Sequence, residues 1–271
     1  MTNHSGKGAA LRALHQQPGA FIIPNPWDIG TARILAAIGF KALATTSAGY
    51  AFSLGLRDGR VTREQHLAHC RDIVGATDLP VSADLEKGFG DSPESSAETI
   101  RAAAETGLAG CSIEDSTGKS DAPIFDFNLA VERIAAAVEA KNKLPQDFVL
   151  TARSENFLWG RTDLDDTVKR LQAFEKAGAD VLYAPGLRDL ETIRQVCSAV
   201  TKPVNVMMGM GPASFGVKEL ADAGVKRVST GPALTMAAFT GFVEAAKEMK
   251  EKGTFGFATK SIGFGELAAF F

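Results

Sequence analysis

Acidic side chains follow two short apolar segments of this 271-residue chain at the point where each segment ends. Asp84 and Glu86 stand two residues apart after the first, so in an extended chain they would point to the same side. Glu114 ends the next apolar segment. Converging carboxylates repel unless a cation lies between them, and oxygen ligands without a His or Cys partner favour Mg²⁺ or Mn²⁺ over zinc. The spacing predicts such a metal site, with Asp84 binding directly and Glu86 and Glu114 acting largely through water, because Mg²⁺ keeps several waters.

The same residues also have a purely structural interpretation. Acidic residues at strand-to-helix turns are common helix N-caps, and others are solvated loop charges. Arg153, at the end of a later apolar segment, is either a clamp on a substrate carboxylate or an ion-pair partner for one of these acids. Spacing alone does not decide between the two roles.

Cysteine and histidine add no further site. Cys70, Cys111 and Cys197 match no metal or redox spacing, so we expect free, buried thiols. The four histidines all lie in the N-terminal quarter and away from strand ends, which argues against a catalytic histidine or a zinc site: His4, His15, His66 and His69.

The elements that must position the acids alternate along the chain. Eight short segments rich in Val, Ile and Leu predict buried parallel strands, at 21–24, 42–45, 81–84, 110–114, 148–153, 181–184, 204–207 and 227–229. Amphipathic helices are predicted between them, at 29–38, 63–76, 95–105, 129–143, 164–176, 190–199 and 213–223. Eight strands with intervening helices over about 250 residues predict a (β/α)8 TIM-type barrel. A doubly wound dinucleotide fold is disfavoured because residues 25–28 read Asn-Pro-Trp-Asp where its glycine-rich turn would be.

We expect one barrel domain over residues 1–271, in which residues 253–271 form a C-terminal tail. Long loops at 47–62 and 115–128 would both lie on the face where barrels carry active sites. The tail holds five phenylalanines among glycines, and such apolar surface predicts cover by a neighbouring subunit.

Charge and hydropathy exclude several classes of partner. The net charge of −3 is spread out, which gives no reason to expect nucleic-acid binding. No apolar run approaches the roughly 20 residues that cross a bilayer, and residues 1–17 lack a secretory apolar stretch. We expect a cytoplasmic protein with no membrane contact.

Six short stretches in a fixed order resemble the isocitrate lyase/phosphoenolpyruvate mutase superfamily over nearly the whole chain. They are 24–28 (Pro-Asn-Pro-Trp-Asp), 46–51 (Thr-Ser-Ala-Gly-Tyr-Ala) with 54–58 (Leu-Gly-Leu-Arg-Asp), 81–90 (Val-Ser-Ala-Asp-Leu-Glu-Lys-Gly-Phe-Gly), 112–115 (Ser-Ile-Glu-Asp), 151–155 (Thr-Ala-Arg-Ser-Glu) and 178–180 (Gly-Ala-Asp). The resemblance implies a small carboxylate substrate, Mg²⁺ and tetramers that exchange their last helix.

The resemblance also implies roles for single residues. Asp84 matches the direct magnesium ligand, whereas Glu86 and Glu114 match the acids that hold its waters. Ser47, with the amides of Ala48 and Gly49, matches the grip on a 2-oxo acid. Arg153 and Glu114 match residues at the reacting centre, and Asp58 is the candidate for proton handling or, in phosphorus-transferring members, nucleophilic attack.

One loop departs from the family. Isocitrate and methylisocitrate lyases carry Lys-x-Cys-Gly-His after strand four, and its cysteine serves as the acid. Residues 115–127 here contain neither cysteine nor histidine, and Lys119 is either a remnant of the gating lysine or a solvated loop residue. They also lack a clear Lys-x-x-Ser signature of the mutase-like members. These departures argue against both headline activities of the family and leave the chemistry of a pyruvate-type enolate.

Four functions therefore stay open. The leading one is Mg²⁺-dependent cleavage of a C–C bond beside a 2-oxo or 2-hydroxy carboxylate, either oxaloacetate decarboxylase-like or methylisocitrate lyase-like. A phosphonopyruvate mutase or hydrolase is the alternative, and a non-catalytic 2-oxo acid binder is a third. A Schiff-base aldolase is disfavoured because Lys87 lies beyond its strand. We expect specificity for the distal group to rest on loop and strand-end residues such as Phe125, Phe157, Trp159, Asn205 and Met208.

Overall fold

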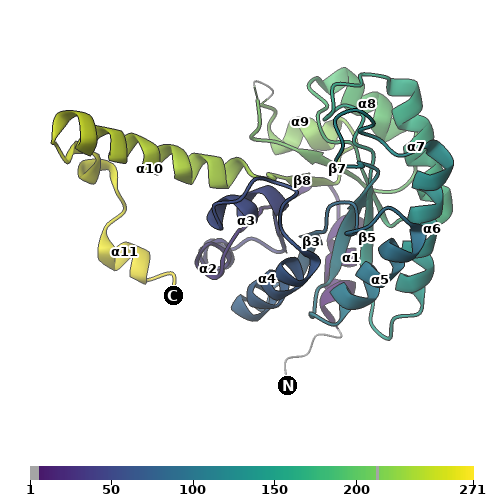
Figure 1. Cartoon of the computed structure of the whole chain (residues 1–271), viewed down its shortest axis with the longest axis horizontal. Coiled ribbons are helices and arrows are strands. Elements are labelled where there is room, and N and C mark those ends of the chain that lie inside the picture. Colours follow the sequence, from purple (N-terminus) through teal and green to yellow (C-terminus); the bar gives the residue numbers. More distant parts are fainter. Residues whose placement is uncertain (1–5, 212–213) are drawn as a thin grey trace.

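The computed structural model describes residues 6–211 and 214–271, and its centre is a barrel of eight parallel strands (Figure 1). The strands are β1 (Phe21–Ile23), β2 (Leu43–Ala44), β3 (Val81–Asp84), β4 (Gly110–Glu114), β5 (Val149–Arg153), β6 (Val181–Tyr183), β7 (Val204–Met207) and β8 (Arg227–Ser229). They pair in the order β1-β8-β7-β6-β5-β4-β3-β2. The Ala44 N–H donates to the Pro24 carbonyl at 3.0 Å, which brings β2 back beside β1. The predicted (β/α)8 barrel is confirmed.

Helices surround the barrel and connect its strands. They are α2 (Ile29–Ile38), α4 (Arg63–Ala76), α5 (Pro93–Ala104), α6 (Phe127–Asn142), α7 (Leu164–Ala177), α8 (Leu190–Ser198) and α9 (Val217–Asp222), whereas α10 (Ala233–Lys252) follows β8 and connects no strands. Their ends follow local chemistry: Asp28 caps α2 through the Thr31 N–H at 2.7 Å, and Gly178 ends α7 at φ 106°, a conformation that glycine adopts without strain.

Helix α1 (Lys7–Gln16), which the sequence patterns did not predict, covers one end of the barrel. Leu11 is fully buried there against Ile23, Ala109 and Val149. His15 of the same helix contacts the Leu11 carbonyl at 2.9 Å, and burial lowers the pKa of His15 to about 3. The imidazole is therefore neutral and structural. His4 lies outside the described residues.

Two other predicted segments differ from the structure. The loop expected at 47–62 begins with a helix, α3 (Ser47–Ser53), whose N-cap Thr46 accepts from the Gly49 N–H at 3.2 Å. Helix α9 begins at Val217 rather than at 213, a residue outside the described ranges. The three cysteines are free as expected, but Cys197 is only partly buried.

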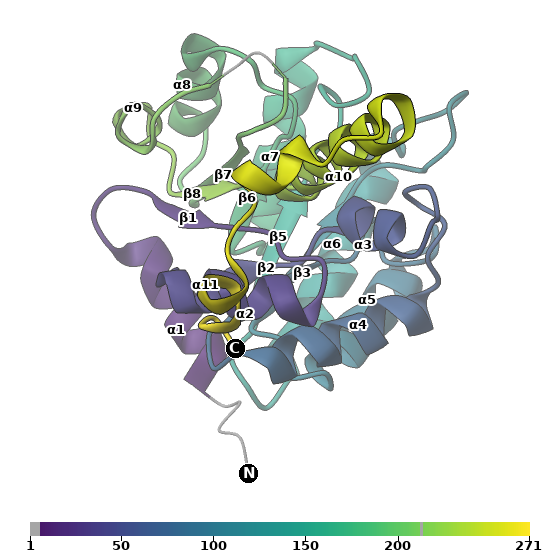
Figure 2. The same ribbon diagram turned by 90° about the vertical axis from the view of Figure 1, so that its left-hand side faces the viewer.

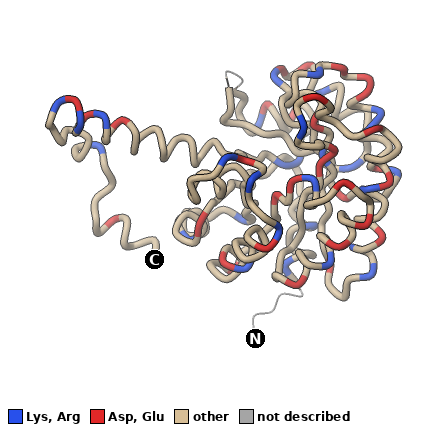
Figure 3. The backbone as a smooth tube through the Cα atoms, in the orientation of Figure 1, with Lys and Arg blue, Asp and Glu red and all other residues tan. Residues whose placement is uncertain are grey.

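The C-terminal region leaves the barrel. Helix α10 projects away from it and leads to η2 (Gly256–Lys260) and α11 (Phe264–Ala268), as Figures 1 and 2 show. The first eleven residues of α10 carry no charge, whereas Lys, Arg, Asp and Glu are interspersed over the barrel helices (Figure 3). Phe242 and Phe264 are 70% and 92% exposed. None of the described helices combines the length and apolarity needed to cross a membrane.

Candidate active site

The predicted site residues meet at the carboxyl edge of the barrel. Asp84, Glu114 and Arg153 are the last residues of β3, β4 and β5, which are consecutive parallel strands. Glu114 pairs in register with Arg153, and Asp84 pairs with Ser112. In a barrel this is the edge where active sites are built.

Arg153 forms the centre of the cluster. Its Nη1 lies 2.8 Å from Asp84 Oδ1, its Nη2 lies 3.2 Å from Glu114 Oε2, and its Nε lies 2.8 Å from Glu155 Oε1. All three partners are acids of the chain itself, so the structure shows the ion-pair role that spacing left open. The role as a substrate clamp stays a prediction, because it requires Arg153 to release one of these partners.

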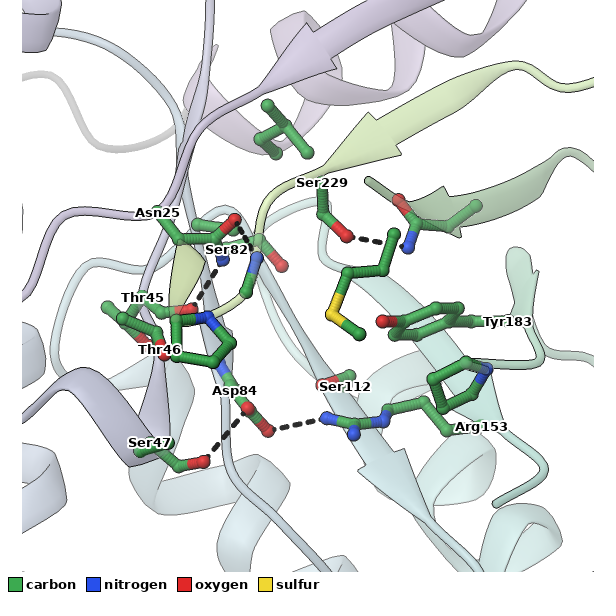
Figure 4. A pocket seen from close by; sticks show the side chains of 18 of the residues that line it. Asn25, Thr45, Thr46, Ser47, Ser82, Asp84, Ser112, Arg153, Tyr183 and Ser229 are labelled. Carbon is green, nitrogen blue, oxygen red and sulfur yellow. Dashed lines mark hydrogen bonds and ion pairs between the residues drawn. The ribbon is translucent and has the colours of Figure 1, made fainter. Parts of the chain in front are cut away.

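Asp84 has the surroundings of a cation ligand. Ser47 Oγ donates to its Oδ2 at 3.1 Å, and Arg153 and the Glu86 N–H donate to its Oδ1 at 2.8 and 3.2 Å (Figure 4). A carboxylate offers about four lone-pair positions. With three of them used, Asp84 keeps one on Oδ2 for a hard cation.

Glu86 reaches the cluster by a route that the sequence did not predict. Its φ of 51° lies in the left-handed region, so the chain turns after Asp84 and the assumption of an extended segment was wrong. The Glu86 carbonyl accepts from the Glu114 N–H at 3.0 Å, which ties the turn to β4. Glu86 therefore lines a cavity with Glu114 by means of this turn.

The donor set fits one direct ligand better than three. Within residues 6–211 and 214–271, no group of three or more His, Cys, Asp or Glu side chains is arranged to hold a metal ion. Mg²⁺ commonly binds one or two carboxylates and keeps its waters. Asp84 as the direct ligand, with Glu86 and Glu114 acting through water, fits this arrangement.

Electrostatics separate the acids. Burial raises the pKa of Glu114 well above its usual range despite Arg153, and repulsion from Glu155 adds to the effect. Burial opposes ionisation of Asp84 too, but the charge of Arg153 and its hydrogen bonds lower its pKa overall. Five acids line the two cavities here, namely Asp58, Asp84, Glu86, Glu114 and Glu155, and they outnumber the basic residues that line the same cavities, which are Arg60, Lys87, Arg153 and Arg227. A bound cation would offset this excess of negative charge.

Ser47 begins α3, and the first turn of that helix lies at the site. Ser47 and Ala48 line the cavity beside Asp84. The amide of Gly49, which is expected to contact a substrate, donates to the Thr46 hydroxyl of the N-cap at 3.2 Å in this structure. A methyl group on Gly49 would overlap the Thr235 hydroxyl and the Thr46 methyl. Gly49 therefore lets α3 approach closely, and its contact with a substrate stays a prediction.

Two adjoining cavities meet at this cluster. The inner one, of about 250 Å³, extends from Ser47 and Asp84 past Tyr183 to Arg227 (Figure 4). The outer one, of about 650 Å³, is lined by Glu86, Glu114 and Trp159. Ser47, Asp58, Arg153 and Leu158 line both.

Asp58 lies on the loop after α3 and keeps exposed surface. Partial desolvation, followed by repulsion from Asp84 and Glu86, raises its pKa. A carboxyl group with a raised pKa at the junction of both cavities is suitably placed to carry a proton.

The residues expected to set specificity are only partly at the cavities. Asn205 and Trp159 line the inner and outer cavity, respectively. Phe125 is buried and stacks against Arg133, 4.4 Å from ring centroid to guanidinium carbon. Met207 and Met210, rather than Met208, line the inner cavity.

The two lysines singled out from the sequence lie in the loops beyond β3 and β4. Lys87 lines the outer cavity and pairs with Asp91, and it also donates to the Thr117 carbonyl at 3.0 Å. Lys119 lies 3.7 Å from the same Asp91, and its side chain is 63% exposed.

Three site residues were missed. His66 of α4 is buried with its Nε2 3.2 Å from Glu86 Oε1, so a histidine does reach the acids. Glu155 pairs with Arg153, although no role for it was predicted. Arg227 starts β8 and lines the inner cavity. The sequence feature that could have indicated His66 was its place on the inward face of α4. Arg227 was not expected in the interior because it follows Lys226, and two adjacent basic residues are typical of a surface.

Fold and site together define a (β/α)8 barrel with a cluster of acidic residues around Arg153 at its carboxyl edge. A sequence model of the family described as phosphoenolpyruvate phosphomutase matches residues 11–250. The 2-methylisocitrate lyase of Escherichia coli (strain K12) is 32% identical over 212 residues, which are 75% of this chain and 70% of that one. An uncharacterised protein of Mycobacterium tuberculosis (strain ATCC 25618 / H37Rv) is 30% identical over 94% of this chain and 93% of its own.

Solved structures agree with these relatives. A protein of Burkholderia cenocepacia J2315, assigned only provisionally as a lyase or mutase, is 56% identical with a TM-score of 0.96 over 98% of this chain and 95% of that one. A 2,3-dimethylmalate lyase is 29% identical with a TM-score of 0.86 over 97% and 94%. The chain belongs to the isocitrate lyase/phosphoenolpyruvate mutase superfamily. The predicted enzyme class, a lyase of this type, is confirmed by these relatives.

Proposed function

We propose that this enzyme cleaves the C–C bond beside a 2-oxo or 2-hydroxy carboxylate through a pyruvate-type enolate, and that oxaloacetate decarboxylation is its simplest reaction. The observation that carries the proposal is Asp84, whose carboxylate faces the inner cavity between Ser47 and Arg153 with one acceptor position to spare. A solved structure of oxaloacetate acetylhydrolase, 26% identical with a TM-score of 0.87, supports this choice of substrate.

Asp84, Glu86 and Glu114 would hold Mg²⁺ or Mn²⁺, directly or through water. When bound, the ion supplies positive charge at the oxygen that becomes negative as the bond breaks. Ser47 and the Ala48 amide would orient the substrate carboxylate at the start of α3. Arg153 would turn from one of its acids to the substrate, which keeps its guanidinium paired throughout.

The absence of the family's cysteine from the loop at residues 115–127 favours carbon dioxide as the leaving group. In decarboxylation, the C3–C4 electron pair moves into the enolate and CO₂ departs, so no acid has to protonate it. A proton then adds to C3, and Asp58 is the proposed donor because its raised pKa keeps it protonated to higher pH.

Oxaloacetate turnover with and without Mg²⁺ tests the proposal. We expect pyruvate formation that depends on Mg²⁺ and falls by at least about 100-fold in Asp84→Ala. Asp91→Ala, an acid of the exposed loop that pairs with Lys87, is the matched control. No turnover, or turnover unchanged in Asp84→Ala, contradicts the proposal.

A phosphonopyruvate mutase or hydrolase is the second candidate, favoured by the match to the phosphoenolpyruvate phosphomutase family and by Asp58 as a possible nucleophile. Phosphate release from phosphonopyruvate without oxaloacetate turnover would favour it. Tight Mg²⁺-dependent oxalate binding with no turnover at all would indicate a non-catalytic binder. A Schiff-base reaction is further disfavoured because the Lys87 amine pairs with Asp91.

We also propose a homotetramer in which α10 and the tail pack on a neighbouring chain. The exposed apolar side chains of this region support it, since contiguous apolar surface usually marks an interaction site. They include Met236, Phe239, Phe242, Val243, Phe255, Phe264 and Phe271.

A further inference from the structure

Arg227 is a cation enclosed within the barrel. It is 5% exposed, starts β8, and lines the same cavity as Asp84 and Ser47. Burial lowers its pKa to about 10, which still leaves it charged at neutral pH. Buried charges normally pair with an opposite charge because desolvation is costly.

The partners of Arg227 are neutral. Its Nε donates to Asn205 Oδ1 at 2.8 Å, and its Nη2 donates to Thr151 Oγ1 at 3.0 Å. Its Nη1 is buried and has no hydrogen-bond partner among the described residues. Arg153, by contrast, pairs with three carboxylates. The inner arginine thus carries an uncompensated charge and a spare donor.

The barrel connects Arg227 to the acid cluster. A continuous row of register partners runs Glu114, Arg153, Tyr183, Asn205 and Arg227 across β4 to β8. Arg153 ends its strand, whereas Arg227 begins one, so the row descends from the rim into the interior, as the stagger of a barrel requires. The cavity follows this descent and exposes Ser82 and Ser112 along its wall.

The interior at this depth is polar, although barrel interiors are usually filled by branched apolar residues. Ser82, Ser112 and Thr151 stand two residues before Asp84, Glu114 and Arg153, and therefore point inward on the same strands. Small hydroxyl side chains leave room above the guanidinium and offer further donors to an anion.

We propose that Arg227 is the distal-group subsite: the substrate is a short dicarboxylate whose first carboxylate lies at Ser47 and the Ala48 amide and whose second descends to Arg227. Asn205, which donates to Ser229 Oγ at 3.0 Å and accepts from Arg227, is a positioning residue that fixes the guanidinium. This deepens the proposed function and rests on its orientation of the first carboxylate.

Substrates with an uncharged distal group are disfavoured by this subsite, because they leave the Arg227 charge without an acceptor. A site built to bond a polar group rejects an analogue that lacks it more strongly than an apolar pocket rejects a change in size.

Calorimetric binding of malate and 2-hydroxybutyrate in the presence of Mg²⁺ tests the proposal, since these stable acids differ in one terminal carboxylate. We expect the wild-type protein to prefer malate by about 10- to 100-fold. Arg227→Gln should reduce that preference to about threefold or less while 2-hydroxybutyrate affinity stays nearly unchanged, and Arg227→Lys should keep an intermediate preference.

Arg60→Gln is the matched control, because Arg60 lines only the outer cavity. Loss of the malate preference in Arg60→Gln but not in Arg227→Gln would place the distal group in the outer cavity and overturn the proposal. Equal affinity of the wild-type protein for malate and 2-hydroxybutyrate would also overturn the proposal, and this measurement does not depend on the folding of any variant. The experiment measures binding, so its outcome is distinguishable from that of the turnover assay. If the protein prefers malate but does not turn over oxaloacetate, the proposed reaction is contradicted and the subsite is retained.

Discussion

The Nη2 of Arg153 lies 3.2 Å from Oε2 of Glu114, its register partner on the neighbouring strand, and their side chains are only 11% and 15% exposed. The pair does not neutralise the cluster, because Arg153 also serves Asp84 and Glu155. The site therefore holds more buried carboxyl groups than one guanidinium can keep ionised, and Glu114 retains a proton to a pH above its usual pKa. A bound cation would offset the charge of the acids that ionise.

Glu114→Gln should stabilise the metal-free protein, and this stabilisation should be larger at higher pH. The folded pKa of Glu114 is raised by burial, so the folded state keeps a proton that the unfolded chain loses near pH 4.3. Its contribution to stability therefore falls as pH rises from about 4.3 through the folded pKa. We expect the stability gain of Glu114→Gln to grow by about 1–2 kcal/mol between pH 5 and pH 8, measured by urea unfolding in EDTA. A gain that is flat with pH contradicts this.

Gly49→Ala should impair the site without unfolding the barrel. The added methyl meets Thr235 and Thr46, so α3 must shift and carry Ser47 away from Asp84. We expect kcat/KM to fall by about tenfold or more. Gly75→Ala in α4 is the control, since nothing lies within 4 Å of its added methyl, and it should gain up to about 1 kcal/mol. Equal activities of the two variants would rule out this role for Gly49.

The tail should hold a tetramer together. We expect sedimentation of the wild-type protein at about four times the 28.6 kDa of one chain. Phe264→Glu places a charge on the most exposed phenylalanine of the C-terminal tail and should shift the population toward smaller species. Lys218→Glu on α9, with its side chain 88% exposed, is the control and should not. A wild-type monomer would argue against the proposed assembly.

The strands and the polar residues at their carboxyl ends were predictable from the sequence, because most of the strands are short apolar segments that stop at a polar residue. The structure between them was harder. Helix α3 was not predicted because it is only seven residues long, contains one glycine and two serines, and depends on the Thr46 cap. The turn at Glu86 was not predicted because the alternation of side chains was applied to Asp84 and Glu86, which assumes that the strand continues beyond Asp84.

Long-range placement accounts for the other misses. Arg227 points inward only because β8 closes the sheet between β7 and β1. His66 reaches Glu86 from a helix, and no local pattern brings α4 to that turn. Which acids bind a metal and which residues touch the substrate stay predictions.

Oxalate binding tests the enolate site most directly, because oxalate is a planar analogue of the pyruvate enolate and needs no turnover. Its dissociation constant should be measured by calorimetry with Mg²⁺ and with EDTA, for the wild-type protein and Asp84→Asn. We predict at least about 100-fold tighter binding with Mg²⁺, and loss of that gain in Asp84→Asn. Equal affinity with Mg²⁺ and EDTA, or an undiminished gain in Asp84→Asn, would contradict a metal-assisted enolate site at Asp84.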